Sequence, residues 1–292
     1  AGEYVLILNP DVLLQPQFLQ NMADELAALP LMALVTATLL QPDGRVNALG
    51  NAITYTGITT CRHLGDRTYP SELYRAPAIS GAAFATRRRD FELLGGFDEE
   101  FFLYLEDTDL SLRALLHGGG CWCTGKAVAV HDYHWRFTPS KQAELETNRL
   151  QLVLKVYQGR TLLALAPGLA LIEVCTLAYA LLRGPAYLRV KLASYGAIVR
   201  RRHGLLRRRR RLQNSRVVGD GDVLGWCTWR LPLRQQLGPI VGTALAWLLA
   251  PAFYPPYAVA SLLAQRHDAR SGLSSGSRAP HHLGAVAARG RA

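Results

Sequence analysis

The sequence has few cysteines and no zinc-type spacing among them. Its 292 residues include five cysteines, an odd and irregularly spaced set (Cys61, Cys121, Cys123, Cys175 and Cys227). The only close pair is C-x-C, which has no second pair at the spacing of a zinc site and is more typical of a strand. The pattern gives no support for a zinc site and favours a reducing, cytoplasmic compartment.

The chain also lacks an initiating methionine and a recognisable signal peptide. It begins at Ala1, and the opening AGEYVLILNPD already has the composition of a buried strand. A domain rarely begins in the middle of its own core. We therefore expect this chain to be a fragment that lacks an N-terminal piece.

Acidic residues are missing from one long stretch. Between residues 183 and 216 there are twelve basic side chains and no Asp or Glu, and apolar segments at 161–182 and 237–264 flank the stretch. Basic loops beside a membrane stay in the cytoplasm and attract anionic head groups. We expect residues 151–266 to be a helical, membrane-associated region with a basic loop at 183–216. Nucleic acid is not an expected partner, because no aromatic platform is interleaved with the arginines.

The segment Thr161–Leu182 is long enough to cross a bilayer. Glu173 near its centre would cost about 2.5–3.5 kcal/mol on insertion scales, and Pro167-Gly168 interrupts it. Because a single crossing would separate the basic loop from the preceding half, we favour a segment that lies in the interface or dips in and returns at Pro167-Gly168. Residues 267–292, rich in Gly, Ser, Ala and Arg, are expected to be disordered.

Several segments of the first half have clear periodicity. A helix is predicted at 16–29, a strand at 31–40, a turn at 41–45 and a helix at 141–157, whereas 47–77 has no clear period. Tyr4–Leu8 is a continuous apolar run, the pattern of a parallel strand covered on both faces. It ends in Asn9-Pro10-Asp11, and ligands bind beyond the carboxyl ends of such strands. Asp11 therefore suits Mg²⁺ or Mn²⁺, although Asn-Pro-Asp is also an ordinary turn.

Three carboxylates, Glu106, Asp107 and Asp109, come at the start of a predicted helix that should end at the glycines 118–120. The N-terminal turn favours acidic residues because its N–H groups lack partners and the helix dipole is positive there. A carboxylate fixed on that turn can face a cleft and act as a general base, but ordinary helix capping explains the same residues.

Two further features flank these carboxylates. Gly81, in the small-residue segment Ser80–Phe84, would let a ligand or backbone approach closely, or would mark a strand bulge. His131 follows a short predicted strand at 127–130. It could complete a metal shell, with His134 as the second choice, or both histidines could simply stabilise the loop.

The order of these motifs carries a family resemblance. SGAAF, RRR, GGFDE and the Glu106-Asp107 pair, with Arg113 further along the helix, resemble the inverting family-2 glycosyltransferases of the GT-A fold, of the bacterial rhamnosyltransferase type. The resemblance implies an α/β, three-layer GT-A sandwich in residues 1–150 that lacks its N-terminal nucleotide-binding part. Asn9-Pro10-Asp11 looks like a variant of the family's D-x-D motif in which Asn9 replaces the first aspartate.

The resemblance also implies residue roles and partners. Asp107 would be the catalytic base with Glu106 beside it, Asp11 and His131 would hold Mg²⁺ or Mn²⁺, and the substrate would contact Asn9, Ser80, Gly81 and Arg113. Arg113 could instead pair with an acidic neighbour. The donor would be a nucleotide-diphosphate sugar and the acceptor a cell-envelope or lipid-linked glycan, at the cytoplasmic face of a bacterial membrane. The alternatives are a catalytically incomplete membrane scaffold and a metal-dependent phosphoryl-transfer or hydrolase enzyme.

Overall fold

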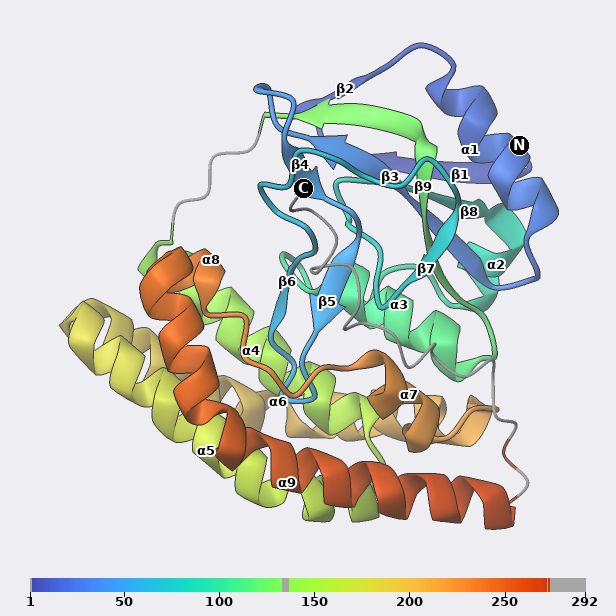
Figure 1. Ribbon diagram of the computed structural model, residues 1–292. Helices are drawn as coiled ribbons and strands as arrows, with labels where there is room; N and C mark the ends of the chain where they lie inside the picture. Colours follow the sequence, from blue (N-terminus) through green and yellow to red (C-terminus); the bar gives the residue numbers. More distant parts are fainter. Residues whose placement is uncertain (1, 133–136, 272, 274–292) are drawn as a thin grey trace.

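The structure is a computed structural model that describes residues 2–132, 137–271 and 273 (Figure 1). Its first half contains a seven-stranded mixed sheet, a separate two-stranded sheet formed by β5 and β6, and three helices. In chain order, these elements are β1 (Tyr4–Leu8), β2 (Val12–Leu14), α1 (Phe18–Ala28), β3 (Ala33–Leu40), β4 (Val46–Ala48), β5 (Asn51–Ile53), β6 (Thr59–Cys61), β7 (Tyr74–Ala76), β8 (Ala83–Arg87), α2 (Arg88–Leu93), α3 (Glu106–Leu116) and β9 (Gly120–His131). The helices predicted at 16–29 and after residue 105 and the strand predicted at 31–40 are confirmed. The segment 47–77 contains three short strands instead of an irregular loop.

The main sheet has the strand order β1-β8-β3-β9-β2, with β4 added to β3 and β7 to β9. Among the strands that the structure describes in this sheet, β3 and β9 are the one parallel pair of neighbours. β1 pairs antiparallel with β8, with Leu8 opposite Ala83, so the prediction of a doubly covered parallel strand is wrong. An apolar run reports burial but not the direction of the neighbouring strand. Because β8 is antiparallel to both β1 and β3, the strands β1, β3 and β9 still run in one direction and end at the same edge.

The sheet separates two helical layers. On one face, alternate residues of β3 such as Val35 and Leu39 pack against Phe18 and Leu26 of α1. On the other face, Leu34 packs with residues of α3 such as Leu110. This alternation follows from the two-residue period of a strand. The predicted three-layer α/β sandwich followed by a helical region is confirmed.

The second half is helical and lies on the side of α3 away from the sheet (Figure 1). Its elements are α4 (Pro139–Val156), α5 (Gly159–Arg183), α6 (Pro185–Ser215), α7 (Asp220–Trp226), α8 (Arg234–Leu237) and α9 (Pro239–Ser271). The helix predicted at 141–157 is confirmed and continues through residue 150, where we placed the domain boundary. One apolar cluster joins this half to Ile53 and Tyr55 of the first half. The proposed division into two regions remains a prediction.

The basic stretch 183–216 is not a loop, because most of it forms the 31-residue helix α6. Arg and Leu are good helix formers, and Pro185 is favourable in the first turn. Part of its charge is used inside the protein: Arg208 lies 3.3 Å from Asp98, and Arg216 lies 2.7 Å from Asp220. The exposed arginines of α6 are therefore fewer than the sequence count indicates.

Helix α5 is continuous through Pro167-Gly168, so the predicted return at that point is wrong. Gly168 is buried where α5 crosses the β5–β6 turn, and a Cβ at this position would lie 2.0 Å from the Tyr55 hydroxyl. The glycine serves close helix packing and does not break the helix. A proline inside a helix removes one hydrogen bond, and packing against neighbours can offset that loss.

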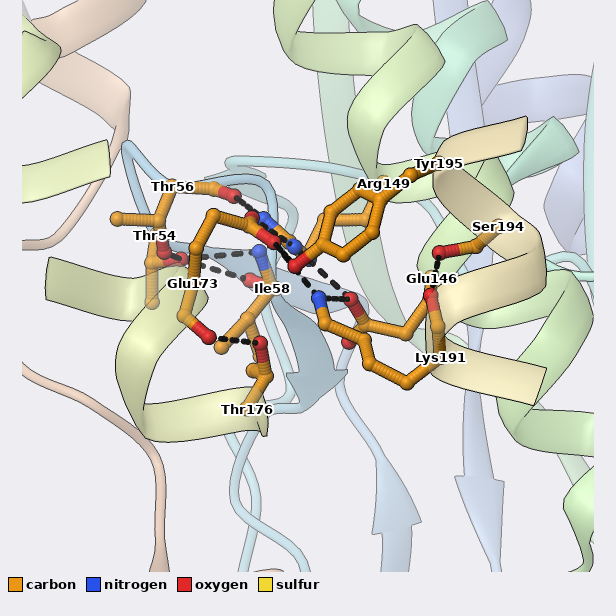
Figure 2. Close-up of polar contacts among 10 residues, drawn as sticks. All are labelled: Thr54, Thr56, Ile58, Glu146, Arg149, Glu173, Thr176, Lys191, Ser194 and Tyr195. Carbon is orange, nitrogen blue, oxygen red and sulfur yellow. Dashed lines mark hydrogen bonds and ion pairs between the residues drawn. The ribbon is translucent and has the colours of Figure 1, made fainter. Parts of the chain in front are cut away.

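Glu173 of α5 is held by cations from two other helices (Figure 2). Its carboxylate lies 2.5 Å from Arg149 of α4 and 2.7 Å from Lys191 of α6, whose side chain is fully buried. Both cations also contact Glu146, at 2.9 and 2.6 Å. Arg149 donates a further hydrogen bond to the carbonyl of Thr56 in the β5–β6 turn. This network, which we call the α4–α6 ion cluster, fixes α5 against the rest of the chain.

The tail expected to be disordered overlaps the last helix, because residues 267–271 belong to α9. Residue 272 and residues 274–292 lie outside the described part of the chain, so that prediction is not tested for them. His134, our second choice for a metal ligand, also lies outside the described residues.

Candidate functional site

Asp107 lies in the first turn of α3 and is held by four hydrogen bonds. The backbone N–H of Gly81 and the side-chain amide of Asn51 donate to its Oδ2, at 2.8 and 3.1 Å. The N–H and hydroxyl of Thr108 donate to its Oδ1, at 2.6 and 3.2 Å. Burial raises the pKa of Asp107 above its usual value, and the hydrogen bonds from Gly81 and Thr108 offset only part of that shift. The result is a half-buried carboxylate in a fixed orientation.

Glu106 precedes it on the same turn and is also half-buried. Burial and then the charge of Asp107 raise the pKa of Glu106 to about 7. Its Oε2 is buried and has no hydrogen-bond partner among the described residues. Buried carboxyl oxygens without partners are uncommon and cluster at functional sites. Two adjacent carboxyl groups with raised pKa values are suited to accept a proton near neutral pH.

Asp11, which lies between β1 and β2, comes close to His131, the last residue of β9. β2 pairs antiparallel with β9, with Val12 opposite His131, and the His131 Nε2 lies 3.4 Å from Asp11 Oδ1. The Asp11 side chain is 40% exposed, whereas that of His131 is buried. The His131 Nδ1 lies 3.1 Å from the side-chain oxygen of Asn47, to which it donates. Burial lowers the pKa of His131, which favours the neutral ring.

This geometry fits a divalent cation. Because the Nδ1–H of His131 is donated to Asn47, the Nε2 of a neutral His131 carries a lone pair, and this lone pair faces the carboxylate of Asp11. A cation between the two groups would bind both. No group of three or more His, Cys, Asp or Glu side chains could hold a metal ion within the described part of the chain. The pair would therefore supply two protein ligands, and water or phosphate would complete the shell, as Mg²⁺ sites commonly require.

The backbone links the Asp11 segment to Asp107. The N–H of Asn9, after β1, donates to the carbonyl of Ala82 at 2.9 Å, and Ala82 follows the glycine whose N–H binds Asp107. Both groups thus lie at the sheet edge where β1 ends and β8 begins. Asn9 itself is exposed, and its contact there is made by the backbone.

The other predicted substrate contacts have different surroundings. Arg113 is buried, lies 2.7 Å from Asp109 and donates to the carbonyl of Leu94. The structure thus pairs Arg113 with its acidic neighbour, which is the alternative that the sequence left open. Ser80 is buried, and its N–H donates to the Thr36 hydroxyl. Gly81 serves a close approach to Asp107, because a Cβ there would lie 3.1 Å from the Asp107 Cβ.

Sequence reasoning missed two asparagines that hold the side chains of Asp107 and His131. Asn51 is buried and donates both to Asp107 and to the carbonyl of Ile79. Asn47 is buried and accepts from His131. Both lie in the part of the chain that has no clear period, so no sequence signal pointed to either.

A cavity of 610 Å³ lies apart from these carboxylates, between the segment after β5 and the helices α8 and α9. Its wall includes Cys61 of β6, Arg230, Arg234 and Trp247 of α9. None of Asp11, Asp107 and His131 lines it, so the three do not surround this cavity.

Comparison with known proteins supplies the family. The family model described as "Glycosyl transferase family group 2" matches residues 4–264. The chain is 30% identical over 143 residues to "O-antigen biosynthesis protein RfbC" of Myxococcus xanthus, a match that covers 45% of this chain and 11% of that protein. It is 28% identical over 130 residues to "N-acetylglucosaminyl-diphospho-decaprenol L-rhamnosyltransferase" of Mycobacterium tuberculosis, covering 39% of this chain and 41% of that protein. The chain thus spans well under two thirds of the length of either relative.

A solved structure of GalNAc-T7 with UDP, GalNAc and Mn²⁺ also shows similarity. The match covers 54% of this chain and 32% of that chain, at 16% identity and a TM-score of 0.44. A superposition at this score assigns neither a substrate nor a metal to the present chain.

Proposed function

This chain belongs to glycosyl transferase family group 2, and from that premise we propose that it transfers a sugar from a nucleotide-diphosphate donor to a hydroxyl group of a lipid-linked or cell-envelope glycan. Two relatives support this choice of acceptor: one carries an O-antigen biosynthesis name, and the other is named as a rhamnosyltransferase acting on a diphospho-decaprenol. The residues of the candidate site could support a single displacement that inverts the anomeric carbon.

The observation that carries the proposal is the fixed carboxylate of Asp107. An acceptor hydroxyl would donate its proton to Asp107 as its oxygen attacks the anomeric carbon, and the bond from that carbon to the donor diphosphate would break. Asn51 and the N–H of Gly81 hold the carboxylate in place, so little reorganisation is needed during the reaction. Glu106, directly adjacent, would orient Asp107 or bind the acceptor. No covalent intermediate is required.

Asp11 and His131 would hold a divalent cation, Mg²⁺ or Mn²⁺. When bound, such an ion neutralises charge on the leaving diphosphate. Asn47 fixes the ring of His131, so that its Nε2 faces Asp11 at 3.4 Å. The exposed side of Asp11 leaves access for a phosphate group from solvent.

We also propose that the chain attaches to the cytoplasmic face of a bacterial membrane through α5 and α9. Both helices are long and apolar enough to cross a membrane, and only 22% and 17% of their most apolar stretches are buried in the protein. Exposed apolar residues include Leu182 and Ile240, at 87% and 84% exposure. Lys191 and Arg149 bind Glu173 at the centre of α5, which favours an interfacial position over a crossing, because a crossing would separate these partners.

The proposal is tested by product analysis. The chain, supplied with a nucleotide-diphosphate sugar, Mn²⁺ and a lipid-linked diphosphate glycan acceptor, should release nucleoside diphosphate and form a glycoside with the inverted anomeric configuration. Free sugar formed without any acceptor would instead favour a hydrolase. If donor binding occurs without either product, an incomplete scaffold becomes the better description. Extraction of membranes with carbonate should release the chain, whereas resistance would favour true spans.

A further inference from the structure

The 610 Å³ cavity lies between β6, in the half of the protein that contains Asp107, and the apolar helix α9. One wall comes from β6 and the turn after it, including Cys61 and His63, and the other comes from Arg230, Arg234 and α9. The side-chain amide of Gln235 donates to the carbonyl of Cys61 at 2.6 Å and ties the two walls together. The cavity is therefore a built feature between two parts of the chain.

The cavity contains two exposed arginines without carboxylate partners. Neither Arg230 nor Arg234 forms an ion pair with any residue that the structure describes, although Arg208 and Arg216 in the same half do. Asp66, the one carboxylate in the wall, lies 2.9 Å from His63. Arginine N–H groups match two phosphate oxygens at once. The charge of this cavity therefore favours an anion, and most of all a diphosphate.

An aromatic and apolar surface adjoins these arginines. The guanidinium of Arg230 lies over the rings of Trp229 and Trp247, at 5.0 and 4.9 Å from the ring centres. Trp247 belongs to α9, where Leu248 is 75% exposed and Val241 is 60% exposed. Stacking on a ring face orients the guanidinium while its N–H edge stays available. A ligand that fits both surfaces has an anionic head and an apolar chain.

One strand of the cavity wall, β6, also contacts the turn that carries Asp107, although Asp107 itself does not line the cavity. Thr59, which begins β6, accepts a hydrogen bond at 3.4 Å from the hydroxyl of Thr108, the residue after Asp107. Cys61 lines the cavity, and burial followed by the charge of Asp107 raises its pKa to about 11. The three residues of β6 therefore connect the cavity wall, at Cys61, to the neighbour of the proposed base, at Thr59.

We propose that this cavity binds the diphosphate of a prenyl-diphosphate-linked acceptor, with the prenyl chain along the exposed apolar face of α9 and the sugar directed past β6 towards Asp107. Arg230 and Arg234 bind the diphosphate, and Trp247 lies where the head group meets the chain. This inference rests on the proposed transferase function, since it assigns the acceptor of that reaction to a particular place. It separates two diphosphates: the donor lies near Asp11 and the acceptor lies near Arg230.

The test uses farnesyl diphosphate as the probe and the full 292-residue chain in neutral detergent. Arg230→Gln and Arg234→Gln should each weaken its binding about tenfold, the loss expected for one charge-assisted hydrogen-bonding group. The matched control is Arg266→Gln, which removes the same charge from the far end of α9, about 28 Å along the helix from Trp247. Arg266 is exposed, so the control should bind farnesyl diphosphate as the unaltered chain does.

Three comparisons separate this inference from its competitors. UDP with Mn²⁺ should not displace farnesyl diphosphate, and displacement would place the probe in the donor site and overturn the inference. Vesicles of phosphatidylglycerol test a simple head-group surface: if the two substitutions weaken vesicle binding but not farnesyl diphosphate binding, the inference is wrong. Equal binding by all three variants would also refute it. Asp107→Asn, which stops transfer if the proposed function holds, should leave farnesyl diphosphate binding unchanged, so that each idea can fail separately.

Discussion

Gly81→Ala is a small change that should act directly on the proposed base. The backbone of Gly81 is outside the left-handed region, so alanine introduces no backbone strain there. The new Cβ, however, would lie 3.1 Å from the Cβ of Asp107 and 3.3 Å from its Oδ2. Both distances are shorter than ordinary van der Waals contact, so the Asp107 side chain must move by a few tenths of an ångström.

The size of the effect follows from that displacement. Misplacing a reacting group by 1 Å can cost about 100-fold in rate, so a third of that distance corresponds to a loss of about fivefold in kcat. Overpacking should cost about 1 kcal/mol of the free energy of unfolding. Binding of the nucleotide donor should hardly change, because the hydrogen bond from Asn9 to this region is accepted by the backbone carbonyl of Ala82, which the substitution leaves in place.

The assay measures kcat for transfer, the donor dissociation constant and thermal unfolding together. Gly225→Ala is the matched control, because a Cβ at that position meets nothing within 4 Å and the residue lies inside α7. The control should keep its kcat and gain slightly in stability. If Gly81→Ala retains the full kcat, or loses donor binding as strongly as kcat, then Gly81 does not position Asp107 for catalysis.

Three further predictions concern the metal pair, the ion cluster and the acidic pair. Asp11→Ala should remove the Mn²⁺ dependence of UDP binding, whereas Asp43→Ala, in an exposed turn, should keep it; an unchanged Mn²⁺ titration would exclude Asp11 as a ligand. Lys191→Met removes one of the two cations that pair with Glu146 and Glu173 and should lower the free energy of unfolding by about 3 kcal/mol. The exposed control Arg202→Met should lower it by at most about 0.5 kcal/mol. Similar denaturant midpoints for the two variants would contradict the role of the α4–α6 ion cluster. Because the pKa of Glu106 is raised to about 7 in the folded chain, the folded state binds the extra proton, and stability should fall as pH rises from about 4.5 to 7, by about 2 kcal/mol after allowing for partial exposure. Glu106→Gln should flatten that part of the profile, and a parallel profile would refute the assignment.

The parts of the fold that the sequence predicted are those with strong local patterns. The helix that carries Asp107 follows from its acidic first turn and the glycines after it, and the family resemblance is confirmed by the family match. The direction of β1 could not be predicted, since its neighbour β8 is about 75 residues away and an apolar run looks the same in either orientation. The basic stretch was predicted to be a loop from its charge, but its Arg and Leu residues favour a helix and most of it forms α6.

Within the candidate site, the sequence predicted the pairing of Asp11 with His131 but not the asparagines that hold His131 and Asp107. Asp11 and His131 were expected to meet, and they do. Asn51 binds Asp107 and Asn47 binds His131, yet asparagine is common in loops and gave no signal. Arg113 has the spacing of a ligand residue, but its pairing with Asp109 in the interior depends on packing that spacing does not encode.

The most direct measurement compares Asp107→Asn with the unaltered chain in transfer and in donor binding. Asparagine keeps the size of the side chain and removes the basic oxygen. We expect transfer to fall at least about 100-fold, the lower end of the contribution of a general base, while the dissociation constant for UDP with Mn²⁺ stays within about twofold. Turnover that persists in Asp107→Asn, with donor binding intact, would mean that another group accepts the proton.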